Sequence, residues 1–309
     1  MCLVVLAACF VLLCSSAASA RPRRRHRAVA VHSSVRSASD AGQSRSQRKT
    51  RKSARPRQTG LAAAVKSRIA LVEDANTSEL LLQKSADKVT PIASITKLMT
   101  AIVVLDAKPP LDDVLTIADA DRDFVKGSTS RLNVGWSLSR ADMLHLALMS
   151  SENRAAAALS RYYPGGQPAF LKAMNAKAAE LGMAHTRFVN PNGLTPENVS
   201  TAFDLAKLVQ AAYQYPLIRE YSTDPEYVVR IGRHTLQYVN SDRLVRSPGW
   251  DIEVQKTGFI NESGHCAVMR VRADGRDLIM IFLDGDGKLT RFADAQRVRK
   301  QLALAQKKQ

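Results

Sequence analysis

The sequence has few cysteines, and it lacks the patterns that hold metal ions or phosphate groups. Three of its 4 cysteines, Cys2, Cys9 and Cys14, lie near the start of the chain, so a protein that loses this segment keeps only Cys266 and forms no internal disulfide. None of the 6 histidines makes a metal-binding pair at helical spacing, and no glycine-rich phosphate loop is present. These absences predict a protein without a metal ion or another cofactor. Cys266 lies in an apolar strand pattern, which favours a buried small side chain over a reactive thiol.

Residues 1–20 form an uncharged, largely apolar segment that ends in Ala18-Ser19-Ala20, the cleavage pattern of a secretory signal peptide. Its apolar core is too short for a comfortable transmembrane helix. The stretch from Leu6 to Cys9 is also similar to a lipoprotein cleavage box, but it lies unusually close to the first residue. We therefore predict a signal peptide over residues 1–20, export of the mature chain and no transmembrane anchor in it.

Acidic side chains are almost absent from residues 21–60, which hold 13 Lys and Arg against the single acid Asp40. This segment accounts for most of the net charge of +17, and it has no hydrophobic periodicity. Such a composition predicts a disordered basic linker. Two interpretations stay open: the linker is simply solvated, or residues 21–57 hold the protein to an anionic envelope surface. The linker has no aromatic side chain for base stacking, which argues against nucleic acid as a partner.

Residues 61–309 are long enough for one catalytic domain with a large core. Strand patterns stand near both ends of this region, and they cover residues 68–72, 79–82, 227–230, 234–236, 266–271 and 278–283. Helical patterns dominate from Ser94 to about Tyr221 and return near the end; they include residues 139–149, 152–162, 168–181, 201–213 and 288–304. This order predicts an α+β fold, in which one antiparallel sheet is flanked by helices.

The first motif that carries chemistry is Ser94-Ile95-Thr96-Lys97. Pro91 stands just upstream, where a helix start tolerates it, and the apolar run from Leu98 to Leu105 follows. A helix that is apolar on nearly all faces is buried, so we expect Ser94 in the first turn of a core helix and Lys97 one turn deeper. Residues three apart share a helix face, where an amine can take the proton of a serine hydroxyl. An ordinary capping serine with a surface lysine is the alternative.

The second motif is Ser151-Glu152-Asn153. A capping box formed by Ser139 and Asp142 opens one helix, and a second helix begins at about residue 152, so the motif lies at their junction. Side chains at such a junction can point into a cleft. The alternative is that Ser151 only caps the second helix.

The third motif, Lys256-Thr257-Gly258, occurs once and is predicted to lie in or beside a strand, because it stands between Trp250–Gln255 and Phe259–Ile260. Its lysine offers a cation for a carboxylate, and its glycine lets a ligand or another backbone come close. A strand end with a solvated lysine is the alternative. Together the three motifs supply a nucleophile, a base, a proton relay and a carboxylate-binding cation, which is a complete set for acyl transfer without histidine.

The ordered set resembles that of the penicillin-recognising serine acyltransferases, which comprise penicillin-binding proteins and serine β-lactamases. The segments Ala93–Thr100, Ser151–Ala156, Asn190–Leu194 and Lys256–Glu262 are similar to the low-molecular-mass D-alanyl-D-alanine carboxypeptidase and endopeptidase family of serine peptidases. Ser-Glu-Asn, where carboxypeptidases commonly carry Ser-Gly-Asn, favours the periplasmic endopeptidase branch. The resemblance covers most of the mature chain and implies the penicillin-binding-protein/β-lactamase-like transpeptidase fold.

A lysine acts as a base only when it is neutral, and burial on a core helix together with the nearby Lys256 favours that state for Lys97. The resemblance implies that Ser94 attacks the carbonyl of the penultimate D-alanine and that Ser151 relays a proton to the leaving amine. It also implies an oxyanion hole formed by the backbone N–H groups of Ser94 and Phe259.

Substrate binding falls, by the same resemblance, to Asn153, Lys256, Thr257 and Gly258. Asn153 would hold the substrate amide and contact Lys97, and the lysine and threonine of the third motif would bind the carboxylate of the D-amino acid beyond the scissile bond. The expected partners are the peptide stems of peptidoglycan, and also β-lactams, which mimic the scissile bond and act as covalent inhibitors.

The most specific hypothesis is a periplasmic D-alanyl-D-alanine endopeptidase that cuts cross-links through an acyl-enzyme on Ser94. A D-alanyl-D-alanine carboxypeptidase is the nearest alternative. A β-lactamase is less favoured, because no Glu-x-x-Leu-Asn lies between the second and third motifs. A non-catalytic envelope-binding protein with inert motifs is the remaining alternative.

Overall fold

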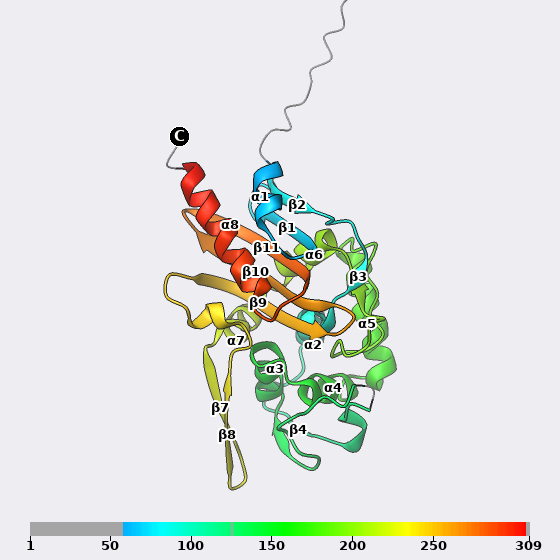
Figure 1. Ribbon diagram of the computed structural model, residues 1–309. Coiled ribbons are helices and arrows are strands. Elements are labelled where there is room, and N and C mark those ends of the chain that lie inside the picture. Colours follow the sequence, from blue (N-terminus) through cyan, green and yellow to red (C-terminus); the bar gives the residue numbers. More distant parts are fainter. Residues whose placement is uncertain (1–57, 125, 307–309) are drawn as a thin grey trace, which may run out of the picture. The chain divides into compact units, whose positions relative to one another are not determined.

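A five-stranded antiparallel sheet forms the centre of the fold in the computed structural model, which describes residues 58–124 and 126–306 (Figure 1). The strand order is β2-β1-β11-β10-β9. The strands are β1 (Ile69–Asp74), β2 (Leu80–Lys84), β9 (Asp251–Ile260), β10 (Gly264–Ala273) and β11 (Arg276–Gly285). Asp274 and Gly275 join β10 to β11 with positive φ angles of 51° and 74°, the backbone that a tight hairpin requires. Because β9 is the last strand in this order, one of its edges pairs with no other strand of the sheet.

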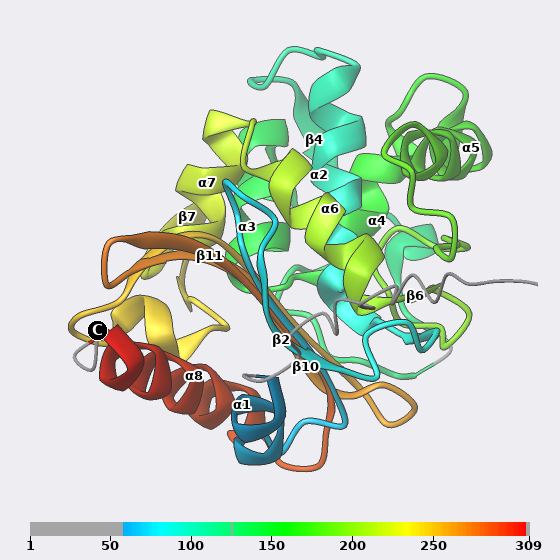
Figure 2. The ribbon, with the colours of Figure 1, turned by 90° about the horizontal axis from the view of Figure 1, so that it is seen from above.

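Alternate side chains of the sheet enter two separate hydrophobic clusters, one on each face. Ile69, Leu71 and Val268 pack against the larger group of helices, whereas Ala70 and Met269 pack against the C-terminal helix. This burial on both faces explains the almost continuous apolar runs of the central strands. Figure 2 shows α1 (Gln58–Ala64) and α8 (Thr290–Gln306) on one face and the other helices on the opposite face.

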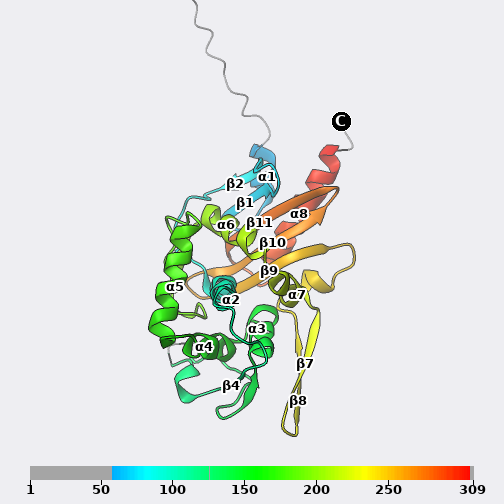
Figure 3. The same cartoon turned by 180° about the vertical axis from the view of Figure 1, so that it is seen from behind.

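The larger helical group encloses α2 (Thr96–Asp106), which Figure 3 shows nearly end-on. Nine of its residues, from Thr96 to Val104, are buried, as the apolar run predicts. The surrounding helices are α3 (Arg140–Met149), α4 (Asn153–Arg161), α5 (Gly166–Glu180), α6 (Ala202–Ala212) and α7 (Pro216–Thr223). Ser139 and Asp142 form the predicted capping box of α3.

The predicted elements are all present, with ends shifted by a few residues, but the prediction of one sheet was incomplete. Three further two-stranded sheets occur in the described part: β3 (Thr90–Pro91) with β6 (Val199–Ser200), β4 (Val114–Thr116) with β5 (Ser137–Ser139), and β7 (Glu226–Ile231) with β8 (His234–Val239). Three short 3-10 helices complete the order: η1 (Ala93–Ile95), η2 (Asp119–Asp121) and η3 (Arg243–Arg246).

The β7–β8 ribbon stays separate from the main sheet because its apolar side chains pack on a helix instead. Tyr227 donates a hydrogen bond to Asp142 of α3 at 2.6 Å, and its ring stacks on His145 of the same helix at 3.9 Å. Period-two alternation predicts strands but does not name their partners.

The predicted signal peptide and nearly all of the predicted basic linker lie outside the described residues. Within residues 58–124 and 126–306, no helix is both long enough and apolar enough to cross a bilayer.

Candidate active site

Ser94 lies in the 3-10 turn η1, immediately before α2, and it is 8% exposed. Ala93 before it adopts a left-handed φ of 48°, which is uncommon for a residue with a side chain. Two glycines approach this turn closely. A Cβ atom on Gly193 would lie 2.0 Å from the Ala93 carbonyl oxygen, and one on Gly258 would lie 3.0 Å from the Ser94 nitrogen. The Lys-Thr-Gly motif of β9 therefore lies directly against the Ser94 backbone.

Lys97 is fully buried, and its amine points at Ser94. The Nζ atom lies 2.8 Å from Ser94 Oγ, 2.8 Å from Asn153 Oδ1 and 2.7 Å from the carbonyl oxygen of Asn192. Burial lowers the pKa of Lys97 from 10.5 to about 7, while the carboxylate of Glu152 acts in the opposite direction. The predicted contact between Lys97 and Asn153 is therefore present, and burial is the larger of the two effects on the Lys97 pKa.

The three partners of the amine differ in what they can do. Asn153 Oδ1 and the Asn192 carbonyl oxygen can only accept hydrogen bonds, whereas Ser94 Oγ can accept or donate. A neutral Lys97 has two N–H donors and one lone pair. If both donors serve the two oxygens that only accept, the lone pair faces the Ser94 hydroxyl. The surroundings of Lys97 therefore orient the neutral amine as a base for Ser94.

Ser151 lies between α3 and α4, as predicted, and has a left-handed φ of 65°. It does not cap α4; Glu152 does, with Oε1 accepting from the Arg154 nitrogen at 3.3 Å. Within the described residues, no hydrogen bond occupies the Ser151 hydroxyl. The alternative of a purely capping serine is therefore wrong. Asn153, which begins α4, also donates through Nδ2 to Ser128 Oγ at 3.1 Å.

Lys256 is fully buried on β9, so the alternative of a solvated lysine at a strand end is wrong. Its Nζ donates to the Thr257 carbonyl oxygen at 3.0 Å. Burial lowers its pKa well below the ordinary value, and the positive charges of Lys97 and Arg291 lower it further, while Asp242 acts in the opposite direction. The amine of the first motif is thus one of the charges that act on the amine of the third.

The free edge of β9 faces the helical group. The Ile260 N–H donates to Ser263 Oγ in the β9–β10 turn, at 3.1 Å, and the Gln255 N–H donates to Ser222 Oγ of α7, at 3.3 Å. Because successive N–H groups of a strand point to opposite edges, the N–H of Phe259 shares the free edge with that of Gln255. The Thr257 hydroxyl donates to Ser241 Oγ at 2.7 Å. Lys97 thus contacts Ser94 and Asn153, and Gly258 of β9 lies against the Ser94 backbone, while Ser151 stands two residues before Asn153 at the α3–α4 junction.

Two contributors were not identified from the sequence. Asn192 provides a backbone oxygen, which no residue pattern reveals, although its segment Asn190–Leu194 is one of those that resemble the family. Glu152 was noted only as a departure from the carboxypeptidase motif, yet its carboxylate acts on Lys97. The sequence did contain a signal for Glu152. Asn153 was predicted to contact Lys97, and Glu152 is its neighbour in the chain, so an effect of this carboxylate on Lys97 could have been expected.

Two other features of the described chain lie apart from this site. Cys266 is buried, and burial raises its pKa to about 11, so the prediction of an unreactive thiol side chain is consistent with its surroundings.

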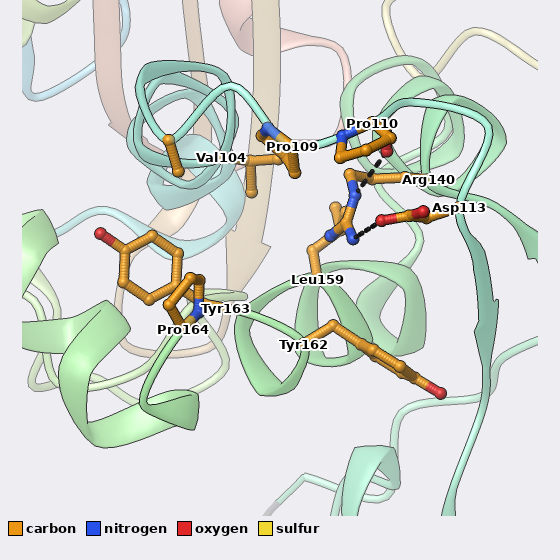
Figure 4. A pocket seen from close by; sticks show the side chains of 10 residues that line it. Val104, Pro109, Pro110, Asp113, Arg140, Leu159, Tyr162, Tyr163 and Pro164 are labelled. Atoms are coloured by element: carbon orange, nitrogen blue, oxygen red, sulfur yellow. Dashed lines mark hydrogen bonds and ion pairs between the residues drawn. The ribbon is translucent and has the colours of Figure 1, made fainter.

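A pocket of about 310 Å³ lies at the opposite end of α2, lined by Val104, Arg140, Leu159 and Tyr163 among others (Figure 4). It contains none of the predicted site residues. No group of three or more His, Cys, Asp or Glu within residues 58–124 and 126–306 could hold a metal ion.

Comparison with known proteins also indicates a serine peptidase that acts on D-alanyl-D-alanine bonds. A family model described as D-alanyl-D-alanine carboxypeptidase matches residues 53–287. The chain is 53% identical over 238 residues to a D-alanyl-D-alanine endopeptidase of Pseudomonas aeruginosa, covering 76% of this chain and 77% of that protein. It is 50% identical over 231 residues to a D-alanyl-D-alanine endopeptidase of Escherichia coli, covering 74% of each.

Solved structures with the same fold include the DD-transpeptidase of Streptomyces K15, with a TM-score of 0.70 and 26% identity, covering 76% of this chain and 95% of that one. Penicillin-binding protein D2 of Listeria monocytogenes in its cefotaxime-bound form has a TM-score of 0.68 and 29% identity, covering 76% and 96%. The expected transpeptidase fold is therefore confirmed.

Proposed function

The chain belongs to the D-alanyl-D-alanine carboxypeptidase family of serine peptidases, and from that premise we propose that it is a D-alanyl-D-alanine endopeptidase that hydrolyses cross-links of peptidoglycan. One observation carries the proposal. The buried amine of Lys97 lies 2.8 Å from the Ser94 hydroxyl, and its other two partners can only accept hydrogen bonds. This arrangement fits a serine nucleophile with a lysine base.

The reaction begins when neutral Lys97 takes the proton of the Ser94 hydroxyl while the Ser94 oxygen attacks the carbonyl carbon of the D-alanyl bond. The tetrahedral oxyanion collapses to an ester on Ser94, and the amine of the second stem leaves. That amine needs a proton, which Ser151 passes to it from the Lys97 ammonium. A water molecule then hydrolyses the ester by the reverse path, which restores the Ser94 hydroxyl and releases the shortened stem with a carboxylate.

The backbone N–H groups of Ser94 and Phe259 are proposed to hold the oxyanion. The close approach of Gly258 to the Ser94 nitrogen and the direction of the Phe259 N–H along the free edge of β9 support this. One such donor contributes about 10²–10³ in rate in serine peptidases. Gly258 serves here by its small size, because a side chain would lie 3.0 Å from the Ser94 nitrogen.

Lys256 and Thr257 are proposed to bind a substrate carboxylate, while Asn153 holds the substrate amide. A carboxylate placed beside Lys256 offsets the burial that lowers its pKa, so a bound substrate favours the charged form of this lysine. Interacting sites influence each other equally. A charged Lys256 therefore favours the neutral form of Lys97, which prepares the base when substrate is present.

We propose the same residues as the target of β-lactams, with acylation at Ser94; two solved structures of Listeria penicillin-binding protein D2 carry cefotaxime and ampicillin. A periplasmic location after signal cleavage, and attachment of residues 21–57 to an anionic envelope surface, remain proposals from the sequence. The carboxypeptidase reaction is the second candidate, because the matching family model carries that name.

Product analysis on cross-linked muropeptide dimers tests the function. Release of monomers supports the endopeptidase, whereas dimers that lose only a terminal D-alanine contradict it in favour of the carboxypeptidase. Labelling by a fluorescent penicillin, and its loss in Ser94→Ala, tests the nucleophile. Fast penicillin turnover without a lasting adduct would indicate a β-lactamase, and the absence of any labelling would indicate a binding protein.

A further inference from the structure

The segment 189–193 contributes to the site without belonging to a helix or strand. Its Asn192 carbonyl oxygen accepts from Lys97 Nζ at 2.7 Å, and it lies 3.4 Å from Ser94 Oγ, a distance too long for a good hydrogen bond between two oxygens. The position of this one oxygen therefore decides where one N–H of the Lys97 amine points. A loop has no ladder of hydrogen bonds of its own, so other groups must hold this oxygen in place.

The side chain of Asn198 is such a group, and it is completely buried. Its Oδ1 accepts from the backbone nitrogens of Val189 at 2.8 Å and Asn190 at 3.1 Å. Its Nδ2 donates to the Asn190 carbonyl oxygen at 2.9 Å and to Thr96 Oγ1 at 2.9 Å. Thr96 stands directly before Lys97, and its hydroxyl donates to the Ala93 carbonyl oxygen at 2.8 Å. A single carboxamide thus joins the loop that carries Asn192 to the turn that carries Ser94 and Lys97.

We propose that Asn198 is a positioning residue, which fixes the Asn192 carbonyl against the Lys97 amine and thereby aims the amine at Ser94. The proposal rests on the proposed function, because it concerns the orientation of the base in that reaction. Asn198 has no hydrogen bond to the nucleophile or the base, and it acts through Thr96 and through the backbone and the Asn190 side chain of the loop, which accepts from its Nδ2 at 3.0 Å.

The expected consequence follows from geometry. When the Asn192 oxygen moves away, the Lys97 amine loses one of the two partners that only accept, and its lone pair is no longer directed at Ser94. A displacement of about 1 Å in a reacting group costs on the order of 10² in rate. The ammonium form also loses an acceptor, so the charged state becomes less favourable and the pKa of Lys97 falls further.

Asn175 of α5 provides a matched control, because it holds the residue just before this segment. Asn175 clamps the backbone of Phe188, donating to its carbonyl oxygen at 2.7 Å and accepting from its nitrogen at 3.0 Å. Asn175 therefore also ties a buried part of this loop by a carboxamide, but it reaches neither Thr96 nor the residues that hold Asn192. Removing it should affect folding without changing the base.

The experiment compares Asn198→Ala with Asn175→Ala in the second-order rate of acylation by a fluorescent penicillin from pH 5 to pH 9. Rates are divided by the fraction of active molecules, which burst titration supplies. Glu152 and Lys256 are the charged side chains that face Lys97, and both variants retain them. We expect Asn198→Ala to lose about 10- to 100-fold of the plateau rate and to shift the midpoint of the profile to lower pH, whereas Asn175→Ala keeps both at the wild-type value. Wild-type plateau and midpoint in Asn198→Ala would overturn the proposal.

A second variant tests whether the position of the Asn192 oxygen controls the base if Asn198→Ala does not fold. Thr100 donates to the Pro191 carbonyl oxygen at 2.6 Å, next to Asn192, and Thr100→Val removes this tether with little change of shape. The same two changes are expected in a weaker form, and a wild-type profile would overturn the proposal. If the wild-type protein itself forms no adduct on Ser94, the proposed function fails instead.

Discussion

The protonation state of Lys97 determines how fast Ser94 can be acylated at each pH. Burial brings the pKa of this lysine to about 7. At pH 7 about half of the molecules then carry a neutral amine, whereas a lysine with an unperturbed pKa would be neutral in only about 0.03% of molecules. Burial on α2 therefore supplies on the order of 10³ times more base at neutral pH.

We expect the second-order rate of acylation to rise about tenfold per pH unit below pH 7 and to level off above about pH 8. Stopped-flow mixing with a fluorescent penicillin at concentrations well below saturation measures this rate for the free enzyme. Lys97→Arg is the control, because a guanidinium stays charged throughout this range. It should abolish acylation at every pH while the circular dichroism spectrum stays that of the wild type.

Two results would refute this reasoning. A rate that is flat from pH 5 to pH 9 would show that Lys97 does not provide the base. A rate that still rises tenfold per unit above pH 9 would show that its amine remains charged at neutral pH, and the burial on α2 would then not have the consequence argued here.

Three further predictions concern single substitutions. Gly193→Ala should reduce the rate of acylation at least about tenfold, since its Cβ would lie 2.0 Å from the Ala93 carbonyl oxygen. The control is Gly275→Ala, where φ is 74° and the space around the Cβ is open. This variant should lose about 1 kcal/mol of stability and keep the acylation rate of the wild type. Lys97→Met should raise the free energy of unfolding at pH 7 by about 2–4 kcal/mol in urea titrations. The unfolded wild type binds more protons than the folded state between about pH 7 and 10.5, so the stability of the wild type rises with pH over that window. The advantage of the variant should therefore fade toward about pH 10.5. Lys256→Gln should lower kcat/KM about 10- to 100-fold for substrates with the carboxylate beyond the scissile bond and far less for the matching amides, and an equal loss for both would contradict its proposed role.

The site residues could be predicted because each motif places its groups by local geometry. Ser94 and Lys97 are three residues apart, and the 3-10 turn that carries Ser94 continues into α2, so the two side chains lie on one face and meet at 2.8 Å. The capping box at Ser139 predicted where α3 begins, and hence where the loop with Ser151 follows it. Burial of Lys97 and Cys266 followed from the apolar residues around them.

The remaining features depend on contacts between distant segments, which periodicity does not encode. The Asn192 carbonyl oxygen reaches Lys97 from 95 positions away along the chain, and a backbone oxygen has no residue type to mark it. The β7–β8 ribbon was predicted as strands, but its packing on α3 depends on Tyr227 and His145, whose pairing only the tertiary structure defines. The left-handed backbone of Ala93 and Ser151 has no sequence signal either, because neither residue favours it.

Several features of the site oppose folding. Lys97 and Lys256 are buried amines whose pKa values are lowered, and each would be charged in the unfolded chain at neutral pH. Ala93 and Ser151, at the first and second motifs, adopt a left-handed backbone that is uncommon for residues with a side chain. A folded core gains nothing from any of the four, since a methionine or a glycine would fit these positions at lower cost. Burial of apolar side chains in the two hydrophobic clusters on the faces of the sheet supplies stability that offsets these costs.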